Sequence, residues 1–577
     1  MRQGIRARAG SLTLVGVPFA FVCILFVVPA LVIVARSLEF PHFSLENYRS
    51  FTDGPAVRQA TINTFMLALQ SSLVAAAIGC VLIAGFVTFG PRWKAVIVGA
   101  LLLPFVASEL VRIVSWLLLL GPEGPLADLL ANLGIHDASL LGGRVGALIG
   151  MVHVELPFFT LAALPTVLAL DSALGRAATS LGANKIQRFL SVTLPLALPG
   201  VVAAWALTFV LGLGYYATPV MLGGVKEQTT LQALILNDIG QGGSWNHAAA
   251  LGVLLVVVAL LGFMILAWAG GLRVIYGGRS DVDHRSQGGV VSASYQRFAY
   301  SDRLWRGPGA LLETRVASRL LRSVHLGLIL LVLLYLAAPT LAAIPASLSG
   351  GTLVELTPDT WSTRWYVTLF QDPAWSASLR TSLLVSIPAA ALATAIGLCA
   401  AIGLVRRYHG VGTRYLTTML MPMIMPIQVT ALGLFFVLTY VGIAFTPLAL
   451  ILGYTLLGLP YAVVVLSAAL QSFDWDVDRA AQSLGSPWWR RAGGILLPLL
   501  RPALMVSLLF AFITAFSELI FALFMRSAYL TTLPVQLWSA VRYDLDPTTA
   551  AAAGVTLIAS VLAVGIVAVG RMGWRPR

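Results

Sequence analysis

Twelve stretches of about 20 mostly apolar residues run along the chain, and they constrain its fold more than any other feature. Their centres lie near residues 24, 75, 106, 156, 207, 259, 332, 390, 426, 457, 511 and 560. A helix needs about 20 such residues to cross a bilayer, where every backbone N–H and C=O must be paired within the protein. Because 58% of the residues are hydrophobic and only 11% are charged, the composition is not that of a soluble globular protein. We therefore predict an all-α polytopic membrane protein with twelve transmembrane helices.

The net charge of +13 is concentrated in every second connection between these stretches. Three Arg precede the first stretch, nine lie from Arg273 to Arg322, and three close the chain, whereas residues 121–143 contain no Lys or Arg. An excess of Lys and Arg marks cytoplasmic connections, so we expect both termini and the central segment on the cytoplasmic side. The first stretch is too long for a signal peptide and lacks a small-residue cleavage site, so we count it as a span.

Neither the basic residues nor the cysteines indicate a site of another kind. The positive charge follows the topology and suits anionic lipid, and no stacking pattern or binding motif accompanies it. Cys23, Cys80 and Cys399 all lie within apolar stretches, which leaves no disulfide framework and no metal-binding Cys/His spacing. We expect a surrounding lipid bilayer, no nucleic-acid partner and no metal.

The second part of the chain repeats the first. Tyr48 in "LENYRSF" falls on Tyr366 in "TRWYVTLF", an offset of 318 residues. Past residues 121–143 the offset drops to 303, so the outer connection of the first half carries 15 extra residues. A duplicated six-span unit explains this pattern. Because six is even, both copies run the same way through the bilayer, and the pathway is expected between them.

The duplication predicts the domain organisation. We expect a first six-span domain at residues 1–274, a cytoplasmic linker at 275–318 and a second six-span domain at 319–577. The linker is rich in Gly, Ser and Arg with acids interspersed, a composition typical of a solvated segment.

Two polar segments, "RAATSLGANKIQRFLSVTLP" from residue 176 and "RAAQSLGSPWWRRAGGILLP" from residue 479, occupy equivalent cytoplasmic connections. A helix can start at Ala177 or Ala480, because alanine is the best helix former, and Gly182 or Gly485 permits the turn that ends it. An ordinary re-entry turn explains one copy equally well. Two copies with equal spacing indicate a surface that binds a partner.

This pattern resembles the EAA motif of binding-protein-dependent ABC importer permeases, where Glu-Ala-Ala is followed by Gly and by an aliphatic-x-Leu-Pro. In that family the motif forms the coupling helix that docks into an ATPase subunit. The matching residues are Arg176, Ala177, Ala178, Gly182, Pro195, Arg479, Ala480, Ala481, Gly485 and Pro498. Both copies have Arg where the family usually has Glu. The resemblance implies a type I ABC importer permease fold of two parallel six-helix repeats.

The resemblance also implies partners and a location. These are an ABC ATPase, expected as a homodimer, on the cytoplasmic side, an extracytoplasmic solute-binding protein on the other, and the bacterial inner membrane. The chain has no G-x-x-x-x-G-K-[ST] motif, so we expect ATP and Mg on the ATPase and no enzymatic activity here. The 15 extra outer residues offer the binding protein an asymmetric contact.

Further stretches resemble the two permeases of polyamine-type importers, joined in one chain. "PFVASELVRIVSW" and "TPVMLGG" resemble the first permease, and "MPMIMPIQVTALGL", "FSELIFALF" and "TTLPVQLWSAVRYDLDPTTAA" resemble the second. The best guess for the solute is therefore polyamine-like, of the spermidine/putrescine type. Related fused permeases for ferric iron, thiamine and 2-aminoethylphosphonate remain alternatives.

Ionisable residues within spans are costly and are candidates for function. Glu109, Glu155, Tyr215 and Glu518 are our candidates for the translocation pathway, where carboxylates and aromatic rings suit a cationic solute. The alternatives are structural. Glu109 can pair with Arg112 three residues on, Glu155 and Glu518 can hydrogen-bond neighbouring helices, and aromatics such as Trp116 and Phe516 more often pack.

An ion-coupled secondary transporter with six plus six spans is the alternative of another class. Both classes fit the number of spans and the long central connection. The paired cytoplasmic segments favour the ATP-driven importer, because an ion-driven carrier has no need for them. A scaffold or channel explains neither these segments nor the duplication.

Overall fold

The computed structural model describes residues 14–122, 124–134, 140–180, 188–240, 243–270, 315–356, 358–406, 412–527, 529–543 and 546–572. Within these ranges the regular secondary structure is helical, apart from two isolated bridges, Ser349 to Trp361 and Ser527 to Leu530. The predicted linker at 275–318 lies outside them except at its end, where α18 (Arg315–Ser347) begins.

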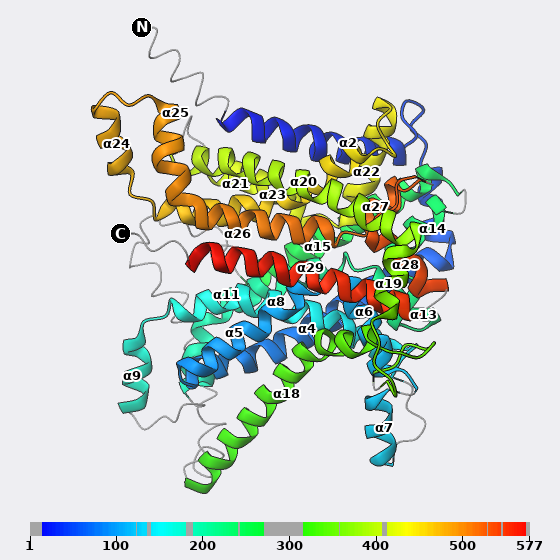
Figure 1. Ribbon diagram of the computed structural model, residues 1–577, viewed down its shortest axis with the longest axis horizontal. Coiled ribbons are helices and arrows are strands. Elements are labelled where there is room, and N and C mark those ends of the chain that lie inside the picture. Colours follow the sequence, from blue (N-terminus) through cyan, green and yellow to red (C-terminus); the bar gives the residue numbers. More distant parts are fainter. Residues whose placement is uncertain are drawn as a thin grey trace.

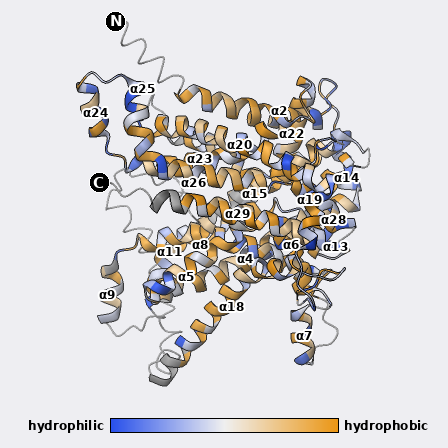
Figure 2. Cartoon of the chain, in the orientation of Figure 1, coloured by the Kyte–Doolittle hydropathy of each residue, from blue (hydrophilic) through white to orange (hydrophobic). Residues whose placement is uncertain are grey.

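The membrane-spanning helices run roughly side by side and form one bundle (Figure 1). In the described part of the chain, eleven helices are long and apolar enough to cross a membrane, and one bent pair brings the number to twelve. Their lengths are mostly apolar, and polar residues gather at the two ends of the bundle (Figure 2). The predicted all-α polytopic fold is confirmed.

The two halves contain the same helices in the same order. In the first half these are α3 (Glu46–Asp53), α4 (Pro55–Thr88), α8 (Arg144–Leu168), α9 (Ser172–Ser180), α11 (Leu194–Gly212) and α15 (Trp245–Gly270). Their counterparts are α19 (Arg364–Gln371), α20 (Pro373–Val405), α23 (Pro447–Gln471), α24 (Trp475–Ser483), α26 (Leu497–Phe516) and α29 (Pro547–Met572). The starts of α3 and α19 differ by 318 residues and those of α8 and α23 by 303, so the predicted duplication is present in the fold.

The third span of each half is broken, which the sequence analysis did not anticipate. In the first half α5 (Pro91–Val106) and α6 (Glu109–Leu120) are separated by two extended residues. In the second half α21 (Thr413–Ile424) and α22 (Ile427–Val441) are bent by 97°. A proline lies in the last turn before each break, and proline supplies no N–H to the helix. The prediction of continuous spans centred near residues 106 and 426 was therefore wrong.

The first span of each half packs on the other half. In the first half α2 (Val28–Ser37) lies against α22, and in the second half α18 lies against α5 and α6. Hydrogen bonds join α18 to α8, since Tyr335 donates to the Ile149 carbonyl at 2.5 Å and His153 Nε2 lies 3.2 Å from the Leu336 carbonyl. The two halves are thereby held together by an exchange of equivalent helices.

Equivalent side-chain contacts also recur in the two halves. The hydroxyl of Tyr48 donates to Ser37 Oγ at 2.7 Å, and that of Tyr366 donates to Ser347 Oγ at 2.9 Å. Each pair joins the end of the first span to the short helix that follows it. The two serines differ by 310 residues and the two tyrosines by 318, so the second half has eight extra residues between the contacts.

Hydroxyls of the second spans cap the helices that precede the last spans. Thr64 Oγ1 accepts a hydrogen bond from the N–H of Leu231, the first residue of α14 (Leu231–Gly240), at 3.0 Å. Ser382 Oγ accepts one from the N–H of Leu533, the first residue of α28 (Leu533–Tyr543), at 2.7 Å. The first N–H groups of a helix have no partner inside it, so the predicted match of Thr64 with Ser382 has a structural reason.

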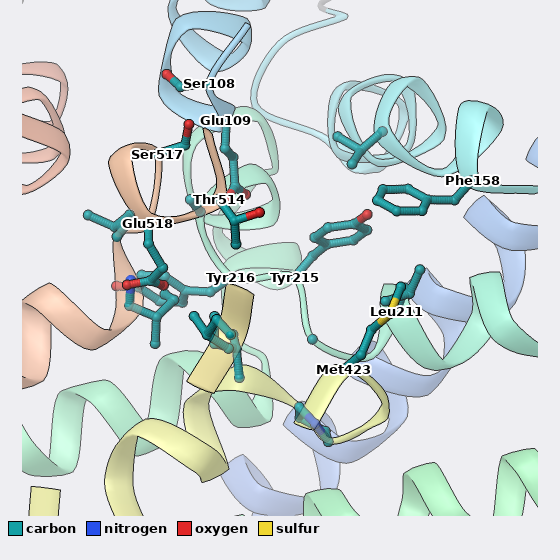
Figure 3. A pocket seen from close by; sticks show the side chains of 18 of the residues that line it. Ser108, Glu109, Phe158, Leu211, Tyr215, Tyr216, Met423, Thr514, Ser517 and Glu518 are labelled. Carbon is teal, nitrogen blue, oxygen red and sulfur yellow. The ribbon is translucent and has the colours of Figure 1, made fainter. Parts of the chain in front are cut away.

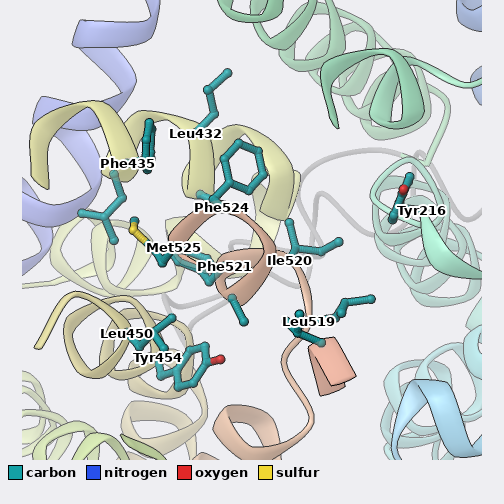
Figure 4. Close-up of a cluster of buried hydrophobic side chains, with 14 of the residues drawn as sticks. Tyr216, Leu432, Phe435, Leu450, Tyr454, Leu519, Ile520, Phe521, Phe524 and Met525 are labelled. Atoms are coloured by element: carbon teal, nitrogen blue, oxygen red, sulfur yellow. The ribbon is translucent and has the colours of Figure 1, made fainter. Parts of the chain in front are cut away.

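A short helix, α27 (Ile520–Met525), is buried in the second half (Figure 4). Its Phe521, Phe524 and Met525 are each at most 4% exposed and lie among side chains of α22 and α23. Gly453 of α23 leaves the space for Phe521, because a Cβ there would lie 2.6 Å from the ring. This packing holds the residues just before α27 at the centre of the bundle.

Candidate functional site

A cavity of about 320 Å³ lies between the two halves. It is lined by both breaks in the third spans, at Ala107-Ser108 and Met425-Pro426, and by the segments that follow the fifth spans, at residues 214–217 and 517–520. The fourth spans contribute Val154 and Phe158 from α8 and their counterparts from α23, Leu457 and Tyr461. The cavity therefore lies between the repeats, where the pathway was predicted.

The backbone polar groups freed at the first break are hydrogen-bonded by Arg112. Its guanidinium donates to the carbonyls of Pro104 and, at 3.1 Å, Ala107. These carbonyls belong to the end of α5, which the break leaves without helical partners. Gln428 does the same across the halves, since its Nε2 donates to the Gly214 carbonyl at 2.8 Å. Irregular backbone at membrane depth occurs where it lines a cavity and is supported in this way.

Glu518 lines the cavity and caps a helix at the same time. Its two carboxylate oxygens accept hydrogen bonds from the N–H groups of Ile520 and Phe521, at 2.7 and 2.8 Å. These are the first N–H groups of α27, so the carboxylate also faces the positive end of that helix. Figure 3 shows Glu518 beside the cavity with Ser517 and Thr514 nearby. A Ser-Glu pair directly before an apolar run was a signal for this cap in the sequence.

Glu109 also lines the cavity, and its side chain has few partners. Oε1 lies 3.4 Å from the hydroxyl of Thr218, which donates to it. Within the described part of the chain no ion pair within 4.0 Å joins Glu109 to Arg112, so the proposed pairing of these two was wrong. Arg112 instead turns to the carbonyls at the break, and Glu109 faces the open space (Figure 3).

Tyr215, the third candidate in the cavity, extends towards Phe158 (Figure 3). Tyr216 and Tyr461 line the same space. Its lining thus combines two acids and one guanidinium with three phenol rings, drawn from both halves.

Glu155 is not among the residues that line this cavity. It is fully buried, and its Oε1 accepts a hydrogen bond from Ser71 of α4 at 2.9 Å. Gly212 of α11 lies beside it, since a Cβ there would come within 2.6 Å of Oε1. The structural alternative, a carboxylate that bonds a neighbouring helix, fits Glu155 better than a place in the pathway.

The aromatic residues Trp116 and Phe516 pack in the core, as the structural alternative predicted. Trp116 lies 5.7 Å from His153 and 5.4 Å from Tyr335 between ring centroids. Phe516 is 1% exposed and stacks on Phe512. Neither lines the cavity.

The predicted coupling segments form helices at one end of the bundle. Both α9 and α24 stand away from the spans on the same side (Figure 1). They begin at Ser172 and Trp475, so the prediction that they start at Ala177 and Ala480 was wrong. The reason is an aspartate before each helix, because Asp171 and Asp474 accept hydrogen bonds from backbone N–H groups two residues on.

The motif residues have matching positions in the two helices. Arg176, Ala177, Arg479 and Ala480 are exposed, and Ala178 and Ala481 are half-buried. Gly485 follows α24 with φ of 79°, the left-handed conformation predicted for the residue that ends the helix. Gly182 lies outside the described residues. Pro195 and Pro498 are each the second residue of the next span, α11 and α26.

One further polar cluster lies at the outer end of the first half. Ser50 Oγ lies 2.8 Å from His247 Nε2, and His247 Nδ1 lies 2.6 Å from Asp238 Oδ2. The order is that of a hydrolytic triad, but Ser50 lies inside helix α3 and its hydroxyl also donates to the Asn47 carbonyl at 3.3 Å. The cluster therefore ties α3, α14 and α15 together.

Comparison with known proteins decides the family. A family model described as a binding-protein-dependent transport system inner membrane component matches residues 393–571. Over 258 residues the chain is 33% identical to the putrescine transport system permease protein PotI of Escherichia coli K12, which covers 43% of this chain and 88% of PotI. The chain belongs to this family of binding-protein-dependent importer permeases. It is thus a transport component and not an enzyme.

Another relative agrees with the duplication. The spermidine/putrescine transport system permease protein PotB of Haemophilus influenzae is 28% identical over 262 residues, which are 43% of this chain and 91% of PotB. Each of these two permeases therefore corresponds to less than half of this chain, as expected if the chain joins two permeases end to end.

A solved structure, a bacterial ABC transporter involved in the import of the acidic polysaccharide alginate, aligns with 43% of this chain and 90% of its own. The TM-score is 0.39 and the identity 18%. Values this low transfer no detail to this chain.

Proposed function

We propose that this importer permease forms the translocation pathway for a polyamine or a similar small organic cation. The observation that carries the proposal is the cavity between the halves, where Glu109 and Glu518 lie among Tyr215, Tyr216 and Tyr461. The printed names of PotI and PotB, which are putrescine and spermidine/putrescine permeases, support the same class of solute.

The chemistry of the cavity suits a cation with more than one amine. An ionised carboxylate at membrane depth costs a few kcal/mol, and a positively charged solute offsets part of that cost. Each tyrosine ring can add about 0.5 to 2 kcal/mol through a cation–π contact. Although the Glu518 oxygens accept backbone hydrogen bonds, a carboxylate has about four lone-pair sites, so it can still accept from an ammonium.

The energy for transport comes from a separate ATPase in this proposal. The helices α9 and α24 dock on the two subunits of that ATPase, which holds ATP and Mg. Exposed apolar residues on and after α24, Val477, Leu484 and Trp488, support a protein contact there. The solute-binding protein docks at the opposite end of the bundle. Both termini and the end bearing α9 and α24 then face the cytoplasm of the bacterial inner membrane.

The extra residues of the first half support an asymmetric contact with the binding protein. They include α7 (Pro125–Asn132), which projects beside the outer end of the bundle (Figure 1). Leu129 and Leu133 are 54% and 68% exposed. Docking of the binding protein on α7 would fix one of the two orientations that a pseudo-two-fold axis permits.

Reconstitution with its ATPase and binding protein in proteoliposomes tests this function. We expect ATP-dependent uptake of radiolabelled spermidine or putrescine, with thiamine, 2-aminoethylphosphonate and ferric iron as the competing solutes. Uptake of one of these in place of both polyamines would overturn the solute class. Uptake driven by an ion gradient without ATP would overturn the mechanism.

A further inference from the structure

The two coupling helices are held differently, although they are equivalent in the repeat. In the second half Asp478 of α24 pairs with two arginines. Its Oδ2 lies 2.6 Å from Nη2 of Arg406, and its Oδ1 lies 3.4 Å from Nε of Arg491. The side chains of Asp478 and Arg491 are each only 12% exposed, so the cluster is largely removed from water.

The two arginines connect α24 to membrane-spanning helices. Arg406 directly follows α20, which runs through the whole bundle. Arg491 is the last residue of α25 (Trp488–Arg491), which leads into α26. The guanidinium of Arg406 also lies 4.1 Å from the ring centroid of Trp475, the first residue of α24. Three segments therefore converge on Asp478.

The first half lacks this anchor at the equivalent described positions. Gly175 stands where the second half has Asp478, and Thr88 stands where it has Arg406. Thr88 donates to the carbonyl of Ala84 in its own helix at 2.8 Å. Arg188, the counterpart of Arg491, is retained, and a Cβ at Gly175 would lie 3.4 Å from its Cδ. No carboxylate is present at this point in the first half to link the helix to the spans.

We propose that Asp478 is a positioning residue that holds α24 rigidly to α20 and α26, so that α24 transmits ATPase movement more directly than α9 does. The inference rests on the proposed docking of both helices on the ATPase. A largely buried ion pair stores a strong penalty for the loss of one partner, because the remaining charge is left uncompensated. The penalty makes separation of α24 from the spans costly, whereas α9 has no equivalent restraint.

Distance measurements on the full chain test the rigidity directly. Spin labels are placed at Gln482 and Arg501 in the second half and at the equivalent Thr179 and Leu198 in the first, after the three native cysteines are replaced. We expect the α24 distance distribution to be narrower than that of α9. Asp478→Asn should widen the α24 distribution about twofold, since the pairing is lost.

Matched variants distinguish positioning from unfolding. Asp476→Asn removes an acid of the same helix whose ion pair with Arg479 is exposed, so it should leave the width unchanged. Asp478→Glu keeps the charge and should restore a narrow distribution. Equal widths for α9 and α24 in the native chain, or no widening in Asp478→Asn, would overturn the inference.

Transport supplies the second readout. With ATPase and binding protein present, Asp478→Asn should lower the amount of spermidine imported per ATP hydrolysed about tenfold, as expected when a restraint of this size is lost. An unchanged ratio would overturn the inference. If the native chain imports no polyamine, the proposed solute class fails, while the distance widths still decide the role of Asp478.

Discussion

Glu109 of the first half and Glu518 of the second line the same cavity, although they are not equivalent positions of the repeat. The position equivalent to Glu109 is Ile427, and the position equivalent to Glu518 is Tyr215. Both of these residues also line the cavity. The duplicated scaffold therefore carries an asymmetric site, in which each half supplies one acid.

The two acids should respond differently to neutralisation. Glu109→Gln is expected to raise KM for spermidine about tenfold, a loss of about 1.4 kcal/mol, with little change in stability, because its one hydrogen bond is long. Glu518→Gln should weaken transport and also lower the free energy of unfolding by about 1 kcal/mol, because Glu518 caps α27. Uptake kinetics and thermal unfolding in detergent measure the two effects.

Glu46→Gln, at an exposed position on α3, is the control for loss of a negative charge. It should change neither KM nor the unfolding temperature. An unchanged KM in both Glu109→Gln and Glu518→Gln would return these residues to structural roles.

Glu155 should be neutral in transport. Glu155→Gln keeps an oxygen that can accept from Ser71, so we expect KM for spermidine to stay within about twofold of the native value. Ser71→Ala should instead lower the unfolding temperature, since it leaves a buried carboxylate oxygen without its donor. A KM increase in Glu155→Gln as large as that of Glu109→Gln would contradict the cavity boundaries described above.

Gly485 should be essential for coupling and not for insertion. Its φ of 79° costs an ordinary residue about 1 to 2 kcal/mol, and a β-branched residue more. Gly485→Val is therefore expected to displace the end of α24 and abolish ATP-dependent uptake while the protein still inserts. We predict the same for Gly182→Val. Gly493→Ala, where a Cβ meets nothing within 4 Å, is the control. Normal uptake by Gly485→Val would remove α24 from the coupling path.

Arg112 should stabilise the break in the third span. Arg112→Met leaves the carbonyls of Pro104 and Ala107 without their charged donor, and each such hydrogen bond contributes about 1.5 to 3 kcal/mol. We expect a lower unfolding temperature and a loss of uptake. Arg112→Lys retains one donor group and should recover part of the stability. An unfolding temperature unchanged in Arg112→Met would show that the break needs no such support.

Much of the fold could be predicted because its signals are local or periodic. An apolar stretch of about 20 residues must span the bilayer wherever it occurs, and equal offsets between Tyr48 and Tyr366 reveal a duplication without reference to space. The coupling segments were found in the same way. Their start was misplaced because the caps at Asp171 and Asp474 outweighed the helix propensity of the alanines.

Other features depended on which segments meet in space. Glu109, Glu155 and Glu518 are all acids in apolar stretches, and no pattern distinguished the two in the cavity from the one bonded to Ser71. Their surroundings come from helices far away in the chain.

The sequence by itself therefore determined the twelve spans, the duplication and the positions of the coupling segments, because hydrophobic length and internal repetition are properties of the chain alone. Tertiary structure alone decided three further features: the broken third spans around the cavity, the exchange of first spans between halves, and the anchor of Asp478 on Arg406. Each of these depends on partners distant in sequence, whose desolvated charges and freed carbonyls are satisfied only when the helices have assembled.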